Sequence, residues 1–133
     1  MPMRQWGMSI LIDLTRLGEA LADFDHAYLM TVSGAGDVKV NTVDPVVTPD
    51  GLVLSGNWGV QARENVALHP NVTLVWPPRV FHGHTLIVDG TATATDATIV
   101  VAPAKAILHR PADHADGPAY ADRDTCVQDC RNV

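Results

Sequence analysis

The segment from residue 51 to residue 76 constrains the fold of this chain more than any other: GLVLSGNWGVQARENVALHPNVTLVW. It predicts a strand over 52–55, a polar loop, a helix over about 60–69 that a His-Pro pair ends, and a strand over 72–76. A loop that enters a helix leaves backbone N–H groups free at the positive end of the helix dipole. The start of this helix is therefore a natural place for a phosphate or another anion.

Composition and charge are those of an ordinary globular domain. With 133 residues, 47% of them hydrophobic and 18% charged, the chain fits one domain that can bury a core without disulfides or metals. The net charge of −6 and the isoelectric point near 5.3 disfavour nucleic acid and anionic membranes as partners, because both reward a basic surface. A local basic pocket for a small anion is compatible with this balance.

Neither a membrane span nor a secretory signal is predicted. The longest apolar runs fall far short of the roughly 20 residues that cross a bilayer. An apolar patch over 8–12 is followed by Asp13, Arg16 and Glu19, and a secretory hydrophobic region does not tolerate such charges. We therefore expect a cytoplasmic protein without membrane contacts.

Residues that commonly bind metals are present but poorly spaced. Cys126 and Cys130 form C-x-x-x-C, which is not the C-x-x-C of redox motifs, and a second pair to complete a zinc site is missing. His82 and His84 would share one face of a strand, yet a carboxylate or third ligand beside them is missing. The sequence therefore predicts no metal site, and two incidental thiols are the favoured interpretation.

The remaining pattern predicts one further helix and several short strands. The helix covers 13–24, with Asp13 as its N-cap and an apolar stripe formed by Leu14, Leu17, Leu21 and Phe24. Strands are predicted over 27–33, 38–48, 52–55, 72–76, 83–95 and 98–102. Six or so strands with two short helices favour a small antiparallel β-barrel.

Three positions along these strands interrupt the regular pattern. Pro45 should bend or bulge the strand 38–48, because proline cannot donate to the ladder. Gly90 is the expected bulge of the strand 83–95. The segment 103–110 is compatible with helix or strand, and from residue 111 onward the composition predicts a loosely held polar tail.

Several weak motifs, taken in order, resemble the pyridoxamine 5'-phosphate oxidase-like flavin-binding split barrels over about residues 14–110. The stretches that carry the resemblance are YLMTV at 28–32, the strand at 36–43, DGL at 50–52, QAREN at 61–65, HPNVTL at 69–74 and GHTLIVDGTA at 83–92. The resemblance implies a mainly β fold: a small antiparallel six-stranded split β-barrel with two or three short helices. It assigns 1–110 to this domain, leaves 111–133 as a polar C-terminal tail, and implies a homodimer with the cofactor at the subunit interface.

The resemblance also implies a class of chemistry. Such proteins bind FMN or a deazaflavin cofactor, and some bind haem. A flavin- or deazaflavin-dependent oxidoreductase would transfer hydride at the cofactor ring to or from a small molecule, while the protein supplies position and excludes solvent. No catalytic side chain is therefore predicted. The alternatives are a flavin- or haem-binding protein without turnover, and a structural dimer that has lost the cofactor.

The resemblance implies a set of cofactor-binding residues on the second strand, in the loop and helix, and at two later strand ends. These are Lys39, Asn41, Thr42, Ser55, Gly56, Asn57, Trp58, Gln61, Arg63, Asn65, Trp76, His109 and Arg110. Lys39 or Arg63 would supply charge to the phosphate. Two positions depart from the FMN-binding pattern: Asn41 stands where a strand arginine is common, and Ala62 where a helix lysine is common. Both changes remove positive charge and favour another cofactor or weak binding.

Each of these residues also has a purely structural interpretation. Asn65 could brace the helix against a strand, and Arg63 could belong to a solvated helix face. Trp76 ends a buried strand, so core packing competes with stacking on a flavin ring, whereas Trp58 lies in a loop where a core role is less natural. The pair at 109–110 either reaches an anion across a dimer or simply ends a strand.

Overall fold

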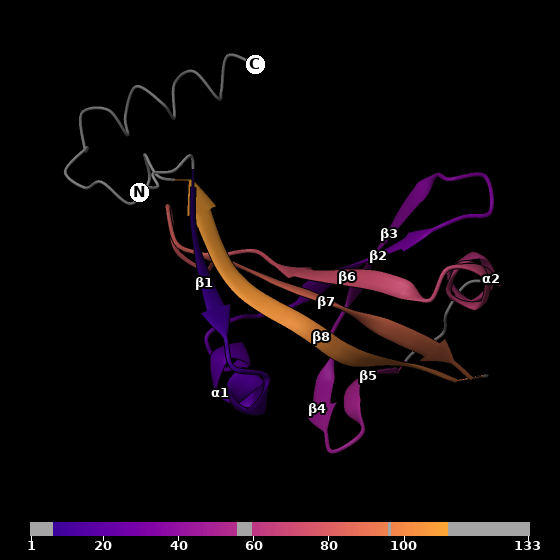
Figure 1. Ribbon diagram of the computed structural model, residues 1–133, viewed down its shortest axis with the longest axis horizontal. Helices are drawn as coiled ribbons and strands as arrows, with labels where there is room; N and C mark the ends of the chain where they lie inside the picture. Colours follow the sequence, from indigo (N-terminus) through magenta and orange to yellow (C-terminus); the bar gives the residue numbers. More distant parts are fainter. Residues whose placement is uncertain (1–6, 56–59, 96, 112–133) are drawn as a thin grey trace, which may run out of the picture.

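One strongly curled antiparallel sheet makes up most of the molecule (Figure 1). The computed structural model describes residues 7–55, 60–95 and 97–111. Within them the strands are β1 (Gly7–Ile12), β2 (Ala27–Val32), β3 (Val38–Val43), β4 (Val46–Thr48), β5 (Gly51–Ser55), β6 (Asn71–Trp76), β7 (Thr85–Ala94) and β8 (Thr98–Pro111). The helices are η1 (Leu14–Arg16), α1 (Leu17–Leu21) and α2 (Val60–Leu68).

The strands follow the order β3-β2-β6-β7-β8-β5-β4, with β1 also paired to β8. The long strand β8 pairs with β7 along one edge, while its other edge pairs first with β5 and then with β1. The sheet therefore curls into a half-barrel with few short helices (Figure 1), which confirms the predicted mainly β split-barrel fold.

The described part of the chain holds eight strands where six were expected, and the differences have local causes. The segment 38–48 divides into β3 and β4 at Pro45, as the missing N–H of proline predicts. The apolar patch at 8–12 belongs to β1, which was not predicted. The ambiguous segment 103–110 continues the strand that begins at Thr98, so β8 is fourteen residues long.

The register of β7 and β8 shifts at Gly90, where a bulge was predicted, but the extra residue lies on β8 and not on β7. Asp89 pairs with Lys105 and Gly90 pairs with Pro103, which leaves Ala104 as the extra residue on β8. Gly90 serves a different purpose there: a Cβ on it would lie 2.5 Å from the carbonyl oxygen of Ala102. Glycine is thus required for the close approach of β8, while the proline beside the bulge cannot complete the ladder.

The predicted helix over 13–24 forms only in part. Asp13 caps it as expected, because its Oδ1 accepts a hydrogen bond of 3.0 Å from the Thr15 backbone N–H. After Leu21 the chain continues with i to i+3 hydrogen bonds, of which the last runs from Phe24 N–H to the Leu21 carbonyl at 3.0 Å. Leu17 is buried, and Leu21 and Phe24 pack against the core. In the described ranges, every helix is too short or too polar to cross a membrane.

The core fills the concave side of the sheet. Because alternate residues of a strand point to opposite faces, each strand supplies every second side chain to this interior. The fully buried members include Leu29, Leu52, Leu54, Leu74, Trp76, Leu86, Val88, Ile99 and Val101. We call this side the inward face of the sheet and the opposite side its outward face.

The close approach at Gly90 generates a stability prediction. Gly90→Ala should lower the free energy of unfolding by about 1–3 kcal/mol, because the added methyl group would collide with the β8 backbone. Gly18→Ala is the matched control: it lies in α1 with open space around its Cβ position, and it should be neutral or stabilising by up to about 1 kcal/mol. Urea unfolding of both variants measures the difference. Equal effects would contradict the packing described for β7 and β8.

Candidate functional site

A buried polar network fixes α2 against β2. The amide nitrogen of Asn65 donates to Thr31 Oγ1 at 3.1 Å, and both side chains are fully buried. Gln61, one turn earlier, donates from Nε2 to Asn65 Oδ1 at 2.6 Å. The bracing role considered for Asn65 is thus what the structure shows, and Gln61 completes it.

Two predicted residues of β3 lie on the same face as this network. Lys39 pairs with Thr31, and Asn41 pairs with Leu29, so all point to the inward face together. Asn41 is partly buried, and its side-chain oxygen is shielded from solvent without a hydrogen-bond partner among the described residues. Buried acceptors are usually satisfied, so this oxygen faces a place suited to a donor. We call Lys39, Asn41, Gln61 and Asn65 the α2 ledge.

The ledge excludes two other predicted residues. Thr42 is exposed and lies on the outward face opposite Tyr28, because it alternates with Asn41. Arg63 is partly buried in α2, but it lies about 200° around the helix from Asn65, since each residue turns the helix by about 100°. Ala62 is fully buried, so the position at which a lysine is common in FMN-binding members packs against the interior here.

The predicted loop lies largely outside the described residues. Ser55 is exposed at the end of β5, and Val60 begins α2. Gly56, Asn57 and Trp58 fall in the gap between them, so their part in an anion site stays a prediction.

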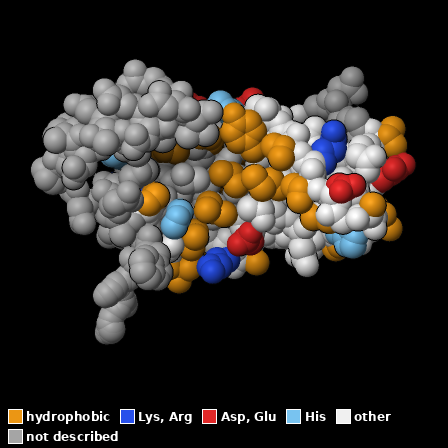
Figure 2. Space-filling model, turned by 90° about the horizontal axis from the view of Figure 1, so that it is seen from above, with side chains coloured by type: hydrophobic (Ala, Val, Ile, Leu, Met, Phe, Trp, Pro, Cys, Tyr) orange, Lys and Arg blue, Asp and Glu red, His pale blue; other side chains and the backbone are white. Residues whose placement is uncertain are grey.

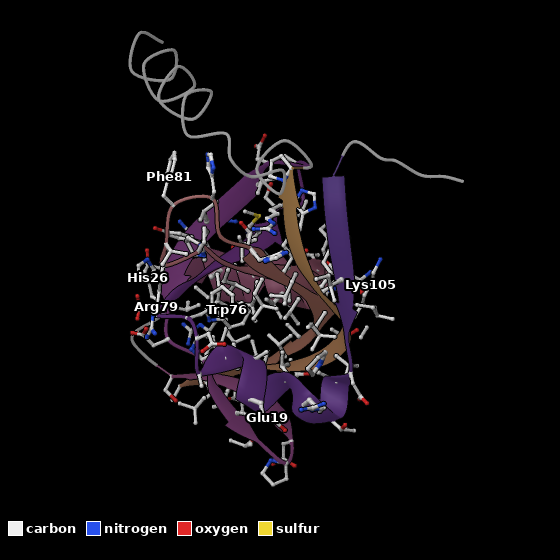
Figure 3. The ribbon with its side chains drawn as sticks, turned by 90° about the vertical axis from the view of Figure 1, so that its left-hand side faces the viewer. Glu19, His26, Trp76, Arg79, Phe81 and Lys105 are labelled. Carbon is white, nitrogen blue, oxygen red and sulfur yellow. The ribbon has the colours of Figure 1, made fainter. Side chains whose placement is uncertain are left out.

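Trp76 lies in the core at the end of β6, with 2% of its surface exposed. It pairs with Leu86 of β7 and is directed into the barrel (Figure 3). Stacking on a cofactor ring would require the indole to leave this packing, and the described contacts account for the residue as a core side chain.

His109 and Arg110 point to opposite faces of β8, although they were predicted to act together. His109 lies on the outward face, where its Nδ1 is 3.2 Å from Ser9 Oγ on the neighbouring β1. Arg110 lies on the inward side, where its Nη1 donates to the His82 carbonyl at 3.2 Å. Both are at the Trp76 end of β6 and β7, whereas α2 lies at the Asn71 end (Figure 1).

A second group of polar residues gathers where Arg110 lies, in the loop 77–84 between β6 and β7. Two features of the sequence pointed to it: the histidine pair at 82 and 84, and Arg110 as a possible partner of an anion. The loop is tied down by Arg79, which forms an ion pair of 2.9 Å with Asp25. Hydrogen bonds from this guanidinium hold the pKa of Asp25 below its ordinary value. At the exposed tip, the ring of Phe81 stacks on His82 with centroids 3.9 Å apart.

The histidines of this loop do not build a metal site with their described neighbours. Residues 7–55, 60–95 and 97–111 contain no group of three or more His, Cys, Asp or Glu side chains that could hold an ion. Cys126 and Cys130 lie outside the described residues.

Comparison with known proteins identifies the family. No family model matches the chain. Two uncharacterised proteins, from Mycobacterium bovis and Mycobacterium tuberculosis, are each 40% identical to it over 134 residues, covering 90% of this chain and 92% of the relative. The chain therefore belongs to one family with these mycobacterial proteins.

Solved structures show which fold this family has. A putative pyridoxamine 5'-phosphate oxidase from Listeria innocua matches with a TM-score of 0.60 and 13% identity, over 72% of this chain and 98% of its own. An F420 reductase matches with a TM-score of 0.55 and 18% identity, over 66% of this chain and 94% of its own. The haem storage protein HutZ from Vibrio cholerae matches with a TM-score of 0.55 and 13% identity, over 70% of this chain and 91% of its own. The chain thus has the split-barrel fold that these three proteins share.

The buried network at α2 gives a stability prediction. Asn65→Ala should lower the free energy of unfolding by about 1–3 kcal/mol, because it leaves the fully buried Thr31 hydroxyl without its partner. Glu64→Ala, one residue away and exposed, is the control and should change stability by less than about 0.5 kcal/mol. Thermal unfolding of both variants provides the measurement. A neutral Asn65→Ala would mean that the brace carries no net stability.

Proposed function

We propose that the protein is a flavin- or deazaflavin-dependent oxidoreductase that acts on a small molecule, with the cofactor bound at the α2 ledge. The unpartnered, buried oxygen of Asn41 carries this proposal, because it lies beside Lys39 on the face to which α2 is fixed. The cation and a helix that begins after a polar loop suit the phosphate of a cofactor, and the acceptor suits a hydroxyl or N–H group of the same molecule. FMN and a deazaflavin cofactor are both such molecules.

The charge of the ledge bears on which cofactor binds. Lys39 is the cation of the ledge, while Asn41 is neutral and Ala62 is buried in the interior. FMN carries a phosphate near charge −2 at neutral pH, and one lysine neutralises only part of it. The structural neighbours include an F420 reductase and a haem storage protein, so the fold accommodates more than one cofactor. We propose FMN and the deazaflavin cofactor as equal candidates and rank haem below both.

The outward face of the sheet supports a dimer as the functional unit. Facing rows of β3, β2, β6, β7 and β8 carry apolar side chains that are exposed or only partly buried: Tyr28, Met30, Val32, Val38, Val40, Val75, Ile87 and Ile107. Hydrophobic side chains form a band across the face of the molecule in Figure 2. A continuous apolar surface of this kind marks an interface, and a second copy of the chain is the partner that we propose.

The dimer predicts a measurable mass. Sedimentation equilibrium of the purified protein should give twice the 14.3 kDa of one chain, and Val40→Glu, in the middle of the outward face of β3, should shift the equilibrium to monomer. Val46→Glu is the control, because Val46 is also exposed but lies on β4, at the other end of the sheet order. A wild-type protein of single-chain mass would remove the dimer from the proposal.

The oxidoreductase proposal is tested by binding and then by turnover. The cofactor-stripped protein is titrated separately with FMN and with the deazaflavin cofactor, and the one that binds is then supplied in reduced form with a panel of small acceptors. Binding followed by cofactor oxidation that depends on acceptor and protein supports an enzyme. Binding without turnover supports a cofactor carrier, and no binding of either leaves haem or a structural dimer.

The ledge assignment is tested most sharply at Lys39. Lys39→Ala should weaken cofactor binding by about 1.5–3 kcal/mol, the scale of a hydrogen bond to a charged group. Arg63→Ala in the same assay shows whether the cation on the other side of α2 shares this role. Arg16→Ala is the control, because Arg16 pairs with Glu19 on the exposed surface near α1. If Lys39→Ala binds as wild type while Arg63→Ala does not, the anchor is Arg63 and the ledge is misplaced.

A further inference from the structure

Two hollows adjoin each other at the Trp76 end of the half-barrel, away from the α2 ledge. Their volumes are about 480 and 520 Å³, within the range of small-molecule pockets. Both are lined by Pro78, Arg79, Val80, Gly83 and Arg110. Six residues of β6 separate this end from the helix end, which is roughly 17 Å at about 3.3 Å per residue. Within one chain, the hollows therefore lie apart from the α2 ledge.

Arg110 presents one edge of its guanidinium toward this space. Its Nη1 donates to the His82 carbonyl at 3.2 Å, which holds the planar group in a fixed orientation. Its Nε is shielded from solvent and has no hydrogen-bond partner in the described part of the chain. Nε and Nη2 form the edge of arginine that binds a carboxylate with two parallel hydrogen bonds. The hydrogen bond to His82 therefore uses Nη1 and leaves the Nε and Nη2 edge available to a ligand.

A second donor without a partner lies beside it. His84 Nε2 is also buried and makes no hydrogen bond with a described residue. Burial lowers the pKa of His84, and the nearby positive charge of Arg110 and the field of His109 lower it further. The imidazole is therefore neutral at neutral pH, and it donates from Nε2 in the corresponding tautomer. Two orphaned nitrogens in one hollow are unusual, because buried polar atoms are normally satisfied.

The charge balance limits what these groups can hold. Arg79 is neutralised by its ion pair with Asp25, and Asp23 lines one of the hollows. Among the described residues, Arg110 forms no ion pair. Because the carboxylates of Asp23 and Asp25 lie near the two arginines, the site suits a ligand with a single negative charge better than a phosphate near −2. Phe24, Val80 and Leu108 add apolar walls that would cover an organic body.

We propose that this hollow binds a small organic monocarboxylate. The Nε and Nη2 edge of Arg110 takes the carboxylate, His84 Nε2 donates a further hydrogen bond, and the apolar walls enclose the body of the ligand. The site goes beyond the cofactor function proposed above and does not depend on it. Because both nitrogens are shielded from solvent, the loop 78–83 must move outward for the ligand to enter.

Binding is tested with benzoate as the probe, by calorimetry on the full chain without added cofactor. Benzamide, which has the same ring without the charge, and phenyl phosphate, with about twice the charge, are the comparison ligands. We expect saturable benzoate binding that is at least tenfold tighter than that of either comparison ligand. No saturation with benzoate, or equal binding of benzamide, would overturn the site. Tighter binding of phenyl phosphate would overturn the assignment of a carboxylate.

The residue assignment is tested by variants that share the hollow. Arg110→Gln should weaken benzoate binding by about tenfold or more, the scale of a charged hydrogen bond, and Arg110→Lys should restore only part of the affinity because lysine lacks the two-pronged edge. Lys105→Gln is the matched control, since it removes a positive charge from an exposed position on the same strand, outside both hollows. Circular dichroism shows whether each variant is folded. An equal loss in Lys105→Gln would overturn the role of Arg110.

The pKa of His84 provides a measurement that a purely structural effect of ligand binding would not change. A carboxylate beside the imidazole favours its protonated form, so benzoate should raise the pKa of His84 from its lowered value. The histidine ring signals in a pH titration by nuclear magnetic resonance report this change. In Arg110→Gln the benzoate-dependent rise should disappear. A His84 pKa that benzoate leaves unchanged in the wild-type protein would contradict the geometry proposed here.

Discussion

The rest of the structure depends on the backbone pairing of β8. This one strand pairs with β7 along ten residue positions and with both β5 and β1 along its other edge. A straight strand could not serve all three partners in a curled sheet, and the extra residue Ala104 opposite Gly90 supplies the bend. The close approach that only glycine permits at Gly90 then fixes the register on both sides. The side chains that strand alternation places on β1, β5, β7 and β8 follow from this register.

Alternation divides the side chains of the sheet into two environments. On the inward face, Lys39 and Asn41 lie opposite Thr31 and Leu29 of β2, the strand to which Asn65 fixes α2. On the outward face, apolar residues of the same strands remain at the surface. A one-residue slip of β3 against β2 would exchange these faces. The α2 ledge and the proposed dimer surface therefore both depend on the pairing register of these two strands. The Arg110 hollow lies at the other end of β6 and β7 and depends on the register of β8 in the same way.

Sequence reasoning succeeded where the signal is local. The strand at 72–76, the helix that starts at residue 60 and the Asp13 cap each follow from patterns within a few residues, and the structure confirms them. The strand β1 and the second half of β8 were missed or left ambiguous, because they are stabilised by pairing with each other across about a hundred residues. Local propensity does not encode such a partner.

The candidate sites were predictable to different degrees. The family resemblance led to the residues around α2, but the exclusion of Thr42 from the ledge and the burial of Ala62 required the register and the packing. Arg110 was predicted as a binding residue, but its hollow was not, because the segment 103–110 was left open between helix and strand. Once the segment is recognised as a strand, alternation alone separates His109 from Arg110 and directs the arginine inward with His84.

The central claim is that the cofactor binds at the α2 ledge rather than at the loop end of the barrel. The most direct measurement is the mapping of backbone amide shifts by nuclear magnetic resonance as the tighter-binding cofactor is added. The account predicts that the largest changes fall on residues 39–41 and 60–65, at the helix end of β6. Changes confined to residues 78–84 and 108–110 would contradict it and would place the cofactor at the Arg110 hollow.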